Sequence, residues 1–311
     1  LGLRPLLGVT VATLGYLFIS TLQVRIVCWV LRPDLVHAYH LKLEATACAL
    51  AGVKPLVVSI WGGLPDRVPP KTKWKLRQRI TRHILHQSDL CIAVSEIQAA
   101  RVREFAGESI RTRVIPLGAD TELFNGSYPS EAAQLRDQLN MGRETTVLFS
   151  PRGLSEIYGH HHILEAFYKA RRTAQKNSFL VFGQLQRQFP RGTKDYIERL
   201  KTRAEALGLT PYIRWLPALP YEKMPAAYSM ADIIINYPRE DAWPSTLCEA
   251  AASRRPILSS GLESYDGTFV TSCSTCVTAE DPEALAVALA DMLNLEKHSL
   301  DAPIARARTI I

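Results

Sequence analysis

The sequence predicts an α/β protein made of two doubly wound domains that face each other across a cleft. Short apolar runs alternate with helix-like segments along the chain, and this alternation is typical of parallel sheets covered by helices. The length of 311 residues is that of about two domains. A polar stretch over residues 126–144 carries no strand signal, so we expect a linker there. The first domain is then expected over residues 1–125 and the second over residues 145–311.

The composition is that of a folded protein in a reducing compartment. Hydrophobic residues make up 47% of the chain and charged residues 22%, which is ordinary for a soluble fold. The six cysteines are scattered through apolar contexts, which favours free buried thiols and a cytoplasmic location. Cys273 and Cys276 have the C-x-x-C spacing, but the second pair that a structural zinc site needs is missing from the sequence.

The chain begins with a long uncharged stretch. Residues 5–24 separate Arg4 from Arg25 without a charge, which is long enough for a transmembrane helix. The stretch runs into further apolar residues and then into an expected strand over residues 34–38. We therefore expect a buried or interface-lying helix of the first domain rather than a membrane span.

The first domain contains further apolar runs that predict strands. These lie at residues 56–60, 90–94 and 114–116, with a helix expected over residues 43–51 and a basic helix after the first run.

Between Arg67 and Arg82 the chain has basic residues and no acidic one, interleaved with Trp74. The basic residues are Arg67, Lys71, Lys73, Lys75, Arg77, Arg79 and Arg82. The simpler interpretation is a solvated helix face. A basic amphipathic helix also suits an anionic membrane surface, which would place the protein peripherally on the cytoplasmic face. Nucleic acid is not favoured, because no binding motif accompanies the patch.

The second domain repeats the alternation. Strands are expected at residues 146–149, 179–182, 213–215, 233–235 and 256–258, and helices near 162–171, 196–207 and 246–253. In such sheets ligands bind at the carboxyl ends of the strands. No G-x-G-x-x-G follows a strand and no Walker sequence occurs, so a nicotinamide enzyme or a P-loop ATPase is disfavoured.

An acidic loop between two of these strands is the strongest functional signal. It contains Asp241, and Glu249 follows after seven intervening residues. Thr246 and Glu249 fit a capping box, with Thr246 as the N-cap, so free backbone N–H groups are expected to face the loop. Such a helix end binds anions. The simpler alternatives are that Glu249 only caps the helix and that Asp241 is a plain turn residue.

A second loop follows the strand over residues 146–149 and contains Arg152. Three consecutive histidines begin at His160, but consecutive helical side chains point about 100° apart and cannot chelate one metal well. Arg152 itself is either a surface charge or a cation at the strand end.

Because of Arg152, Asp241 and Glu249, the chain resembles the retaining family 4 glycosyltransferases, also called glycosyl transferases group 1. Members of this family have the GT-B fold, which consists of two Rossmann-like domains. The family has an Arg after a strand, and later an acidic residue separated by seven residues from a Glu before an Ala-rich helix. Arg152, Asp241 and Glu249 match this order. The matching surroundings are residues 224–228, 231–232 and 255–260 in the second half, and residues 32–37, 88–95 and 114–124 in the first.

The resemblance implies a transfer of sugar from a nucleoside-diphosphate sugar to a glycan or lipid-linked acceptor, with retention at the anomeric carbon and without metal or cofactor. The first domain would hold the acceptor and the second the donor. Arg152 would stabilise the leaving diphosphate, Asp241 would face the donor sugar, and Glu249 would accept hydrogen bonds from the ribose hydroxyls. The helix start at Ser245, Thr246 and Leu247 would supply backbone N–H groups to the phosphates.

The chain departs from the family pattern at several positions. Tyr158 falls where the family usually has a Lys, and Trp61 with Gly62 stands where many members have His-Gly. The family's glycine-rich first loop would precede Leu1, so we expect that the amino terminus is missing and that the first domain is incomplete.

His37 and His40, with Trp61 and Gly62, are the candidates for the acceptor side, and core packing is the alternative for the two histidines. Two other functions stay open: a sugar-nucleotide epimerase or hydrolase on the same fold, since fold does not fix reaction, and a non-catalytic subunit that binds sugar nucleotide.

Overall fold

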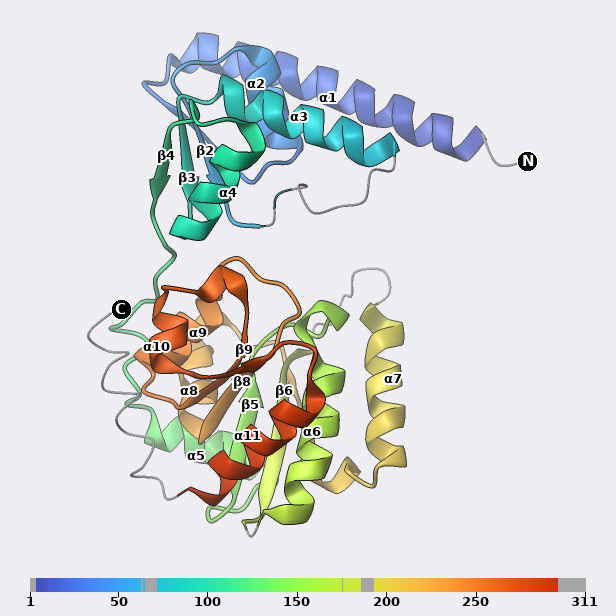
Figure 1. The fold of residues 1–311 in the computed structure, drawn as a ribbon, viewed down its shortest axis with the longest axis vertical. Coiled ribbons are helices and arrows are strands. Elements are labelled where there is room, and N and C mark those ends of the chain that lie inside the picture. Colours follow the sequence, from blue (N-terminus) through green and yellow to red (C-terminus); the bar gives the residue numbers. More distant parts are fainter. Residues whose placement is uncertain (1–3, 63, 65–71, 175, 186–192, 296–311) are drawn as a thin grey trace. The chain divides into compact units, whose positions relative to one another are not determined.

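The computed structural model describes residues 4–62, 64, 72–174, 176–185 and 193–295 (Figure 1). The chain forms two compact units, Leu1–Pro116 and Leu117–Ile311. Each is an α/β unit with one parallel sheet, which confirms the predicted fold class.

The division between the units comes earlier in the chain than the linker expected over residues 126–144. That stretch contains helix α5 (Pro129–Gln138), which belongs to the second unit. Arg136 explains why: its Nε donates to the carbonyl oxygen of Met230 at 2.8 Å, and its Nη2 lies 2.8 Å from Oδ2 of Asp232. The polar composition of residues 129–138 did not indicate a helix, but α5 forms there and is hydrogen-bonded to the second unit.

The first unit has four strands in the order β1-β2-β3-β4 among its described residues, and every neighbouring pair is parallel. Its elements are α1 (Arg4–Leu31), β1 (Val36–Tyr39), α2 (Leu43–Ala51), β2 (Leu56–Ile60), α3 (Thr72–Gln87), β3 (Leu90–Ala93), α4 (Glu96–Ala106) and β4 (Thr112–Val114). Strand β2 is buried along its whole length, as expected for a strand covered on both faces.

The described side chains of α1 are not buried, which contradicts the buried alternative expected for residues 5–24, whereas the interface-lying alternative stays a prediction. None of the window Thr13–Leu31 is buried. Many large apolar side chains of α1 are exposed, including Phe18 and Trp29 at 71% and 77%. The helix packs on α2. Among its described side chains the half-buried ones are Leu17, Ser20, Thr21, Val24 and Cys28, and the others are exposed.

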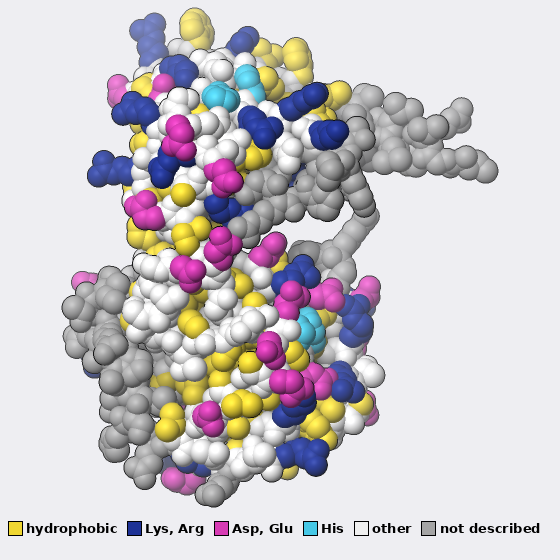
Figure 2. Space-filling model, in the orientation of Figure 1, with side chains coloured by type: hydrophobic (Ala, Val, Ile, Leu, Met, Phe, Trp, Pro, Cys, Tyr) yellow, Lys and Arg dark blue, Asp and Glu magenta, His cyan; other side chains and the backbone are white. Residues whose placement is uncertain are grey.

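Helix α3 carries the described part of the basic segment. Its exposed side chains include Lys75, Arg77, Arg79 and Arg82, and α3 contains no acidic residue. In Figure 2, Lys, Arg and His side chains gather over α3. Of the basic segment predicted from the sequence, Arg67 and Lys71 lie outside the described residues. Exposure fits a solvated helix face and a membrane-facing one alike, so both interpretations stay predictions.

The second unit has six strands in the order β10-β9-β8-β5-β6-β7 among its described residues, all parallel. After α5 its elements are β5 (Thr146–Ser150), η1 (Glu156–Tyr158), α6 (His160–Thr173), β6 (Ser178–Leu185), α7 (Thr193–Ala206), η2 (Thr210–Tyr212), β7 (Ile213–Pro217), η3 (Tyr221–Lys223), α8 (Met224–Met230), β8 (Ile233–Asn236), α9 (Ser245–Ala252), β9 (Ile257–Gly261), η4 (Glu263–Tyr265), α10 (Phe269–Cys273), β10 (Thr275–Thr278) and α11 (Pro282–Asn294).

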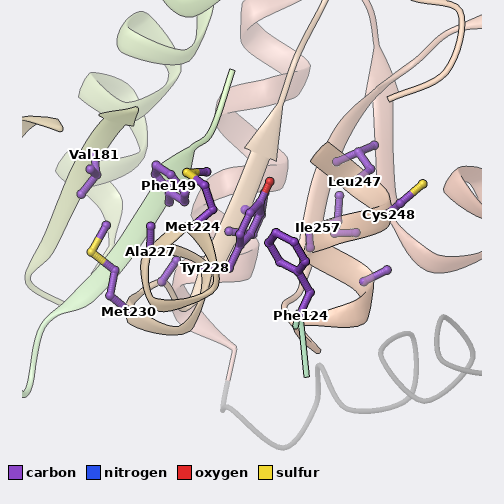
Figure 3. Close-up of a cluster of buried hydrophobic side chains, with 14 of the residues drawn as sticks. Phe124, Phe149, Val181, Met224, Ala227, Tyr228, Met230, Leu247, Cys248 and Ile257 are labelled. Carbon is purple, nitrogen blue, oxygen red and sulfur yellow. The ribbon is translucent and has the colours of Figure 1, made fainter. Parts of the chain in front are cut away.

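Alternate residues of the central strands pack into two separate hydrophobic clusters. Val147 and Phe149 of β5 pack in one cluster, while Leu148 packs in the other, as the twofold period of a strand requires. Figure 3 shows the first cluster, in which Phe124 lies beside Tyr228. Strands β5 and β8 are therefore fixed from both faces, and the loops at their carboxyl ends start from rigid positions.

Candidate functional site

The loop after β5 places Arg152 over an aromatic ring and beside a carboxylate. The guanidinium carbon of Arg152 lies 4.0 Å from the centre of the Tyr158 ring. Its Nη2 lies 3.3 Å from Oδ2 of Asp241, and both side chains are only 13% exposed. A ring face attracts a guanidinium, so Tyr158 steadies the cation. The structure thus brings together three residues that the sequence singled out, and Arg152 is not a surface charge.

Hydrogen bonds from three other residues fix the position of Asp241. Its Oδ1 accepts from the backbone N–H of Ala242 at 2.9 Å, and its backbone oxygen accepts from Oγ of Ser264 at 2.7 Å. Its Oδ2 also accepts from the hydroxyl of Tyr265 at 3.2 Å. This carboxylate is positioned by η4 after β9 as well as by its own loop, so it is more than a turn residue.

The predicted capping box at Thr246 and Glu249 is wrong. Helix α9 begins at Ser245 with Pro244 in the N-cap position and without a side-chain cap. Thr246 therefore lies inside the first turn, where it cannot act as the cap. Oε2 of Glu249 instead accepts from the buried hydroxyl of Tyr228 at 2.7 Å. The Glu249 side chain is half-buried, and one of its carboxylate oxygens is engaged by Tyr228.

The first turn of α9 still offers hydrogen-bond donors. The N–H of Leu247 donates to the carbonyl oxygen of Pro244 at 2.9 Å, whereas the N–H groups of Ser245 and Thr246 meet no acceptor within the described parts of the chain. Oγ1 of Thr246 is buried and likewise finds no partner there. A buried hydroxyl without a partner is costly, and helix N-termini bind anions. This corner therefore suits the oxygen atoms of a ligand.

Burial dominates the protonation of Glu249. Removal from water raises the pKa of its carboxyl group, while the hydrogen bond from Tyr228 and the charge of Arg152 act in the opposite direction without cancelling it. A raised pKa means that the folded protein binds the proton more tightly than the unfolded chain does. Stability then falls as the pH rises from the unfolded value towards the folded one.

We expect the substitution Glu249→Gln to stabilise the ligand-free protein at neutral pH. The amide keeps an acceptor for Tyr228 and removes the buried charge, so a gain of about 1 kcal/mol, seen as a rise of a few degrees in Tm, is expected. The gain should vanish below about pH 4, where Glu249 of the parent protein is protonated in both states. Thermal melts of both proteins across pH measure this, and an equal gain at all pH values would show that burial of charge is not the cause.

Three residues of this site were not identified as functional from the sequence. Tyr228 and Tyr265 are fully buried and donate to Glu249 and Asp241. Burial raises the pKa of each phenol far above its ordinary value, so both remain donors. The indole N–H of Trp243 donates to the carbonyl oxygen of Leu117 at 2.7 Å, which ties the acidic loop to the first residue of the second unit.

The residues predicted to contact the acceptor, His37, His40, Trp61 and Gly62, lie together in the first unit, near the carboxyl ends of β1 and β2. The Trp61 ring lies edge-on to His40 and to Tyr39, at 5.3 and 5.1 Å between ring centres. Nε2 of His37 lies 2.8 Å from Oγ of Ser59. The backbone oxygen of Gly62 accepts from Nε2 of Gln98 at 3.1 Å.

The three histidines at the start of α6 have structural contacts. His160 is fully buried, and burial lowers its pKa to about 4, which keeps it neutral. Nδ1 of His161 lies 3.0 Å from the hydroxyl of Tyr196. Among the described residues no group of three His, Cys, Asp or Glu side chains could hold a metal ion. The six cysteines are all free thiols, but the expectation that they are buried holds for four of them, since Cys28 is half-buried and Cys276 is exposed.

Comparison with known families gives two matches that together cover most of the chain. The family described as "Glycosyl transferases group 1" matches residues 131–309, and the family described as "Glycosyltransferase Family 4" matches residues 4–123.

Two curated relatives are similar at low identity. A GDP-mannose-dependent alpha-(1-6)-phosphatidylinositol monomannoside mannosyltransferase of Mycolicibacterium smegmatis is 23% identical over 68% of this chain and 55% of its own length. A D-inositol 3-phosphate glycosyltransferase of Corynebacterium urealyticum is 24% identical over 86% of this chain and 60% of its own length. The chain therefore spans little more than half the length of these relatives.

Solved structures share the fold. The Anabaena protein HepE in complex with UDP has a TM-score of 0.76 at 20% identity, covering 93% of this chain and 76% of that one. Sucrose-phosphate synthase of Thermosynechococcus elongatus has a TM-score of 0.72 at 18% identity, covering 89% and 69%. At such identities the likeness establishes the architecture alone.

Proposed function

The chain belongs to the glycosyl transferases group 1 family, and from this premise we propose that it moves a sugar from a nucleoside-diphosphate sugar to a glycan or lipid-linked acceptor, with retention at the anomeric carbon. The proposal rests on one observation, the ion pair between Arg152 and Asp241 beside the start of α9. These groups come from the loops after β5 and β8, at the edge of the sheet where doubly wound proteins bind ligands.

Each residue has a role that its surroundings support. Arg152, steadied by Tyr158, and the N–H groups of Ser245 and Thr246 would receive the diphosphate, because a fixed cation and aligned amides stabilise charge as it develops. Glu249 would accept hydrogen bonds from the ribose hydroxyls.

Asp241 would orient the donor sugar and steady the positive charge that develops at its anomeric carbon. The bond from that carbon to the β-phosphate oxygen breaks, the bond to the acceptor oxygen forms on the same face, and the acceptor proton passes to the departing diphosphate. The cation and the amides can neutralise the leaving group, so the proposed reaction needs no metal.

The names of the relatives indicate which donors to test first. One relative is GDP-mannose-dependent, and HepE was solved with UDP. The inositol-based names of the two curated relatives support a polyol or lipid-linked acceptor for this chain.

Thermal melts with UDP-, GDP- and ADP-sugars test the proposal directly. We expect one nucleotide class to raise Tm, since a ligand that binds only the folded state stabilises it by mass action, by about 2.7 kcal/mol at a hundredfold excess over Kd. EDTA should leave the shift unchanged. A panel in which no nucleotide sugar moves Tm would contradict donor binding, and binding without turnover would favour a non-catalytic subunit.

A further inference from the structure

The short 3-10 helix η4 holds Asp241 through both its side chain and its main chain. The Tyr265 hydroxyl donates to Oδ2 of Asp241 at 3.2 Å, and Oγ of the preceding Ser264 donates to the backbone oxygen of Asp241 at 2.7 Å. The first bond fixes the carboxylate and the second fixes the acidic loop. Because η4 follows β9, which pairs with β8 in parallel, the loops after two neighbouring strands meet at this residue.

Tyr265 reaches Asp241 from a rigid part of the core. Its side chain is fully buried and belongs to the same hydrophobic cluster as Phe269. Its N–H donates to the carbonyl oxygen of Leu262 at 2.8 Å, and its own carbonyl oxygen accepts from Oγ1 of Thr268 at 2.6 Å. A close-packed side chain of this kind cannot shift without disturbing its neighbours. The phenol oxygen is therefore a fixed point against which the carboxylate is held.

A neighbouring amide determines which way the Tyr265 hydroxyl points. In the orientation assigned to the amide, Nδ2 of Asn236 donates to the phenol oxygen at 3.5 Å. A phenol has a single proton, so that proton is left for Oδ2 of Asp241. Burial first, and then the charge of Asp241, raise the pKa of Tyr265. The phenol therefore keeps its proton and remains a donor to the carboxylate.

Arg152 is the other partner of the same carboxylate oxygen. Its Nη2 lies 3.3 Å from Oδ2 of Asp241, and the proposed function gives this cation a second partner, the diphosphate. Two anions then share one guanidinium, so the hold of Arg152 on Asp241 weakens as its bonds to the phosphates form. A carboxylate positioned by Arg152 alone would lose its orientation when the donor sugar is bound. The hydroxyl of Tyr265 is buried inside the unit and stays with Asp241.

We propose that Tyr265 is a positioning residue for sugar transfer, which holds the Asp241 carboxylate towards the donor sugar while Arg152 engages the diphosphate. The inference rests on the proposed function and adds a residue that acts through Asp241 without touching the substrate. Tyr265 should therefore govern the rate of the transfer step, while binding of the nucleoside diphosphate depends on Arg152 and the start of α9.

The substitution Tyr265→Phe tests this role, because it removes the hydroxyl and keeps the ring. UDP-glucose and GDP-mannose are the probes, and release of the nucleoside diphosphate is followed with water as the acceptor. We expect kcat to fall about tenfold, the scale of a lost hydrogen bond to a charged group. The Kd of UDP or GDP should stay that of the parent. A variant with the kcat of the parent would overturn the proposal, and so would an equal loss of kcat and of diphosphate affinity.

Tyr237→Phe is the matched control. Tyr237 is also a buried tyrosine, it follows β8 directly, and its hydroxyl is bonded to backbone atoms of Thr278 and Asp281 rather than to a carboxylate. Its loss should lower Tm and leave kcat unchanged. If Tyr237→Phe and Tyr265→Phe lowered kcat equally, a general loosening of the strand ends would be the cause and the positioning role would be wrong.

A double-mutant cycle shows whether Tyr265 acts through Asp241. In Asp241→Ala the hydroxyl has no carboxylate to hold, so adding Tyr265→Phe should leave the residual rate unchanged, as measured in single turnovers with the enzyme in excess. Losses that multiply would mean that Tyr265 affects the site by another route and would overturn the assignment. A parent chain that binds neither probe, or binds a probe without turnover, contradicts the proposed transfer instead, so the two failures are distinguishable.

Discussion

The substitution Arg152→Ala is expected to weaken nucleoside-diphosphate binding by about 1.5–3 kcal/mol, roughly ten- to 150-fold, the scale of a hydrogen bond to a charged group. The loss in kcat should be larger, about 100- to 1000-fold, because the cation acts most strongly on charge that develops as the diphosphate leaves. Calorimetric titration with the nucleotide that raises Tm measures the first effect, and single-turnover transfer measures the second.

Two further variants make the result specific. Arg172→Ala removes an exposed guanidinium from the last turn of α6 in the same unit and should leave binding and transfer unchanged. Arg152→Lys keeps the charge but loses the planar group that stacks on Tyr158, so it should recover only part of the activity. Unchanged affinity in Arg152→Ala would remove this residue from the phosphate site. Equal losses in Arg152→Ala and Arg172→Ala would point to net charge as the cause.

The sequence was sufficient to predict that Arg152 and Asp241 lie at strand ends, because each follows a strand that local patterns identify, while their roles in the reaction stay predictions. Both lie at carboxyl ends of parallel strands, and the fold class alone brings such ends to one edge of a sheet. Tyr265 could not be predicted in the same way. It lies 24 positions beyond Asp241 in the chain and reaches that carboxylate only because β9 pairs with β8, which no local pattern around Tyr265 encodes.

The capping box and the buried alternative for α1 were wrong because tertiary contacts overrode the local pattern. The Thr246 and Glu249 spacing fits a capping box, yet the N-cap is Pro244, two residues earlier, and Tyr228 offers a buried donor to Glu249. For α1, continuous apolarity favoured a buried or interface-lying helix, and the described side chains over residues 13–31 rule out only the buried alternative. In both cases tertiary contacts decided the outcome, and apolarity alone does not say whether protein or lipid provides the cover.

Gly159 lies in the loop that positions Arg152. Its replacement by alanine is expected to lower the free energy of unfolding more than any other small substitution in the second unit. Gly159 has φ of +63°, and a Cβ atom there would lie 2.3 Å from the backbone oxygen of Tyr237. The left-handed conformation alone costs an L-residue about 1–2 kcal/mol, and a backbone oxygen cannot rotate away. A total loss of about 3–5 kcal/mol is therefore expected, measured by urea unfolding.

Gly208 is the matched control for this prediction, because its φ is +68° but no atom lies within 4 Å of a Cβ added there. Gly208→Ala should cost only the conformational part, about 1–2 kcal/mol, so the difference between the two variants isolates the contact with Tyr237. Gly159 directly follows Tyr158, on whose ring Arg152 rests. A shift of this turn should also weaken nucleotide binding in Gly159→Ala, even at temperatures where the variant is folded, while Gly208→Ala binds normally. Equal losses of stability in the two variants would mean that the turn moves away from Tyr237 without cost, and the Arg152 loop would then be more adaptable than its close contacts indicate.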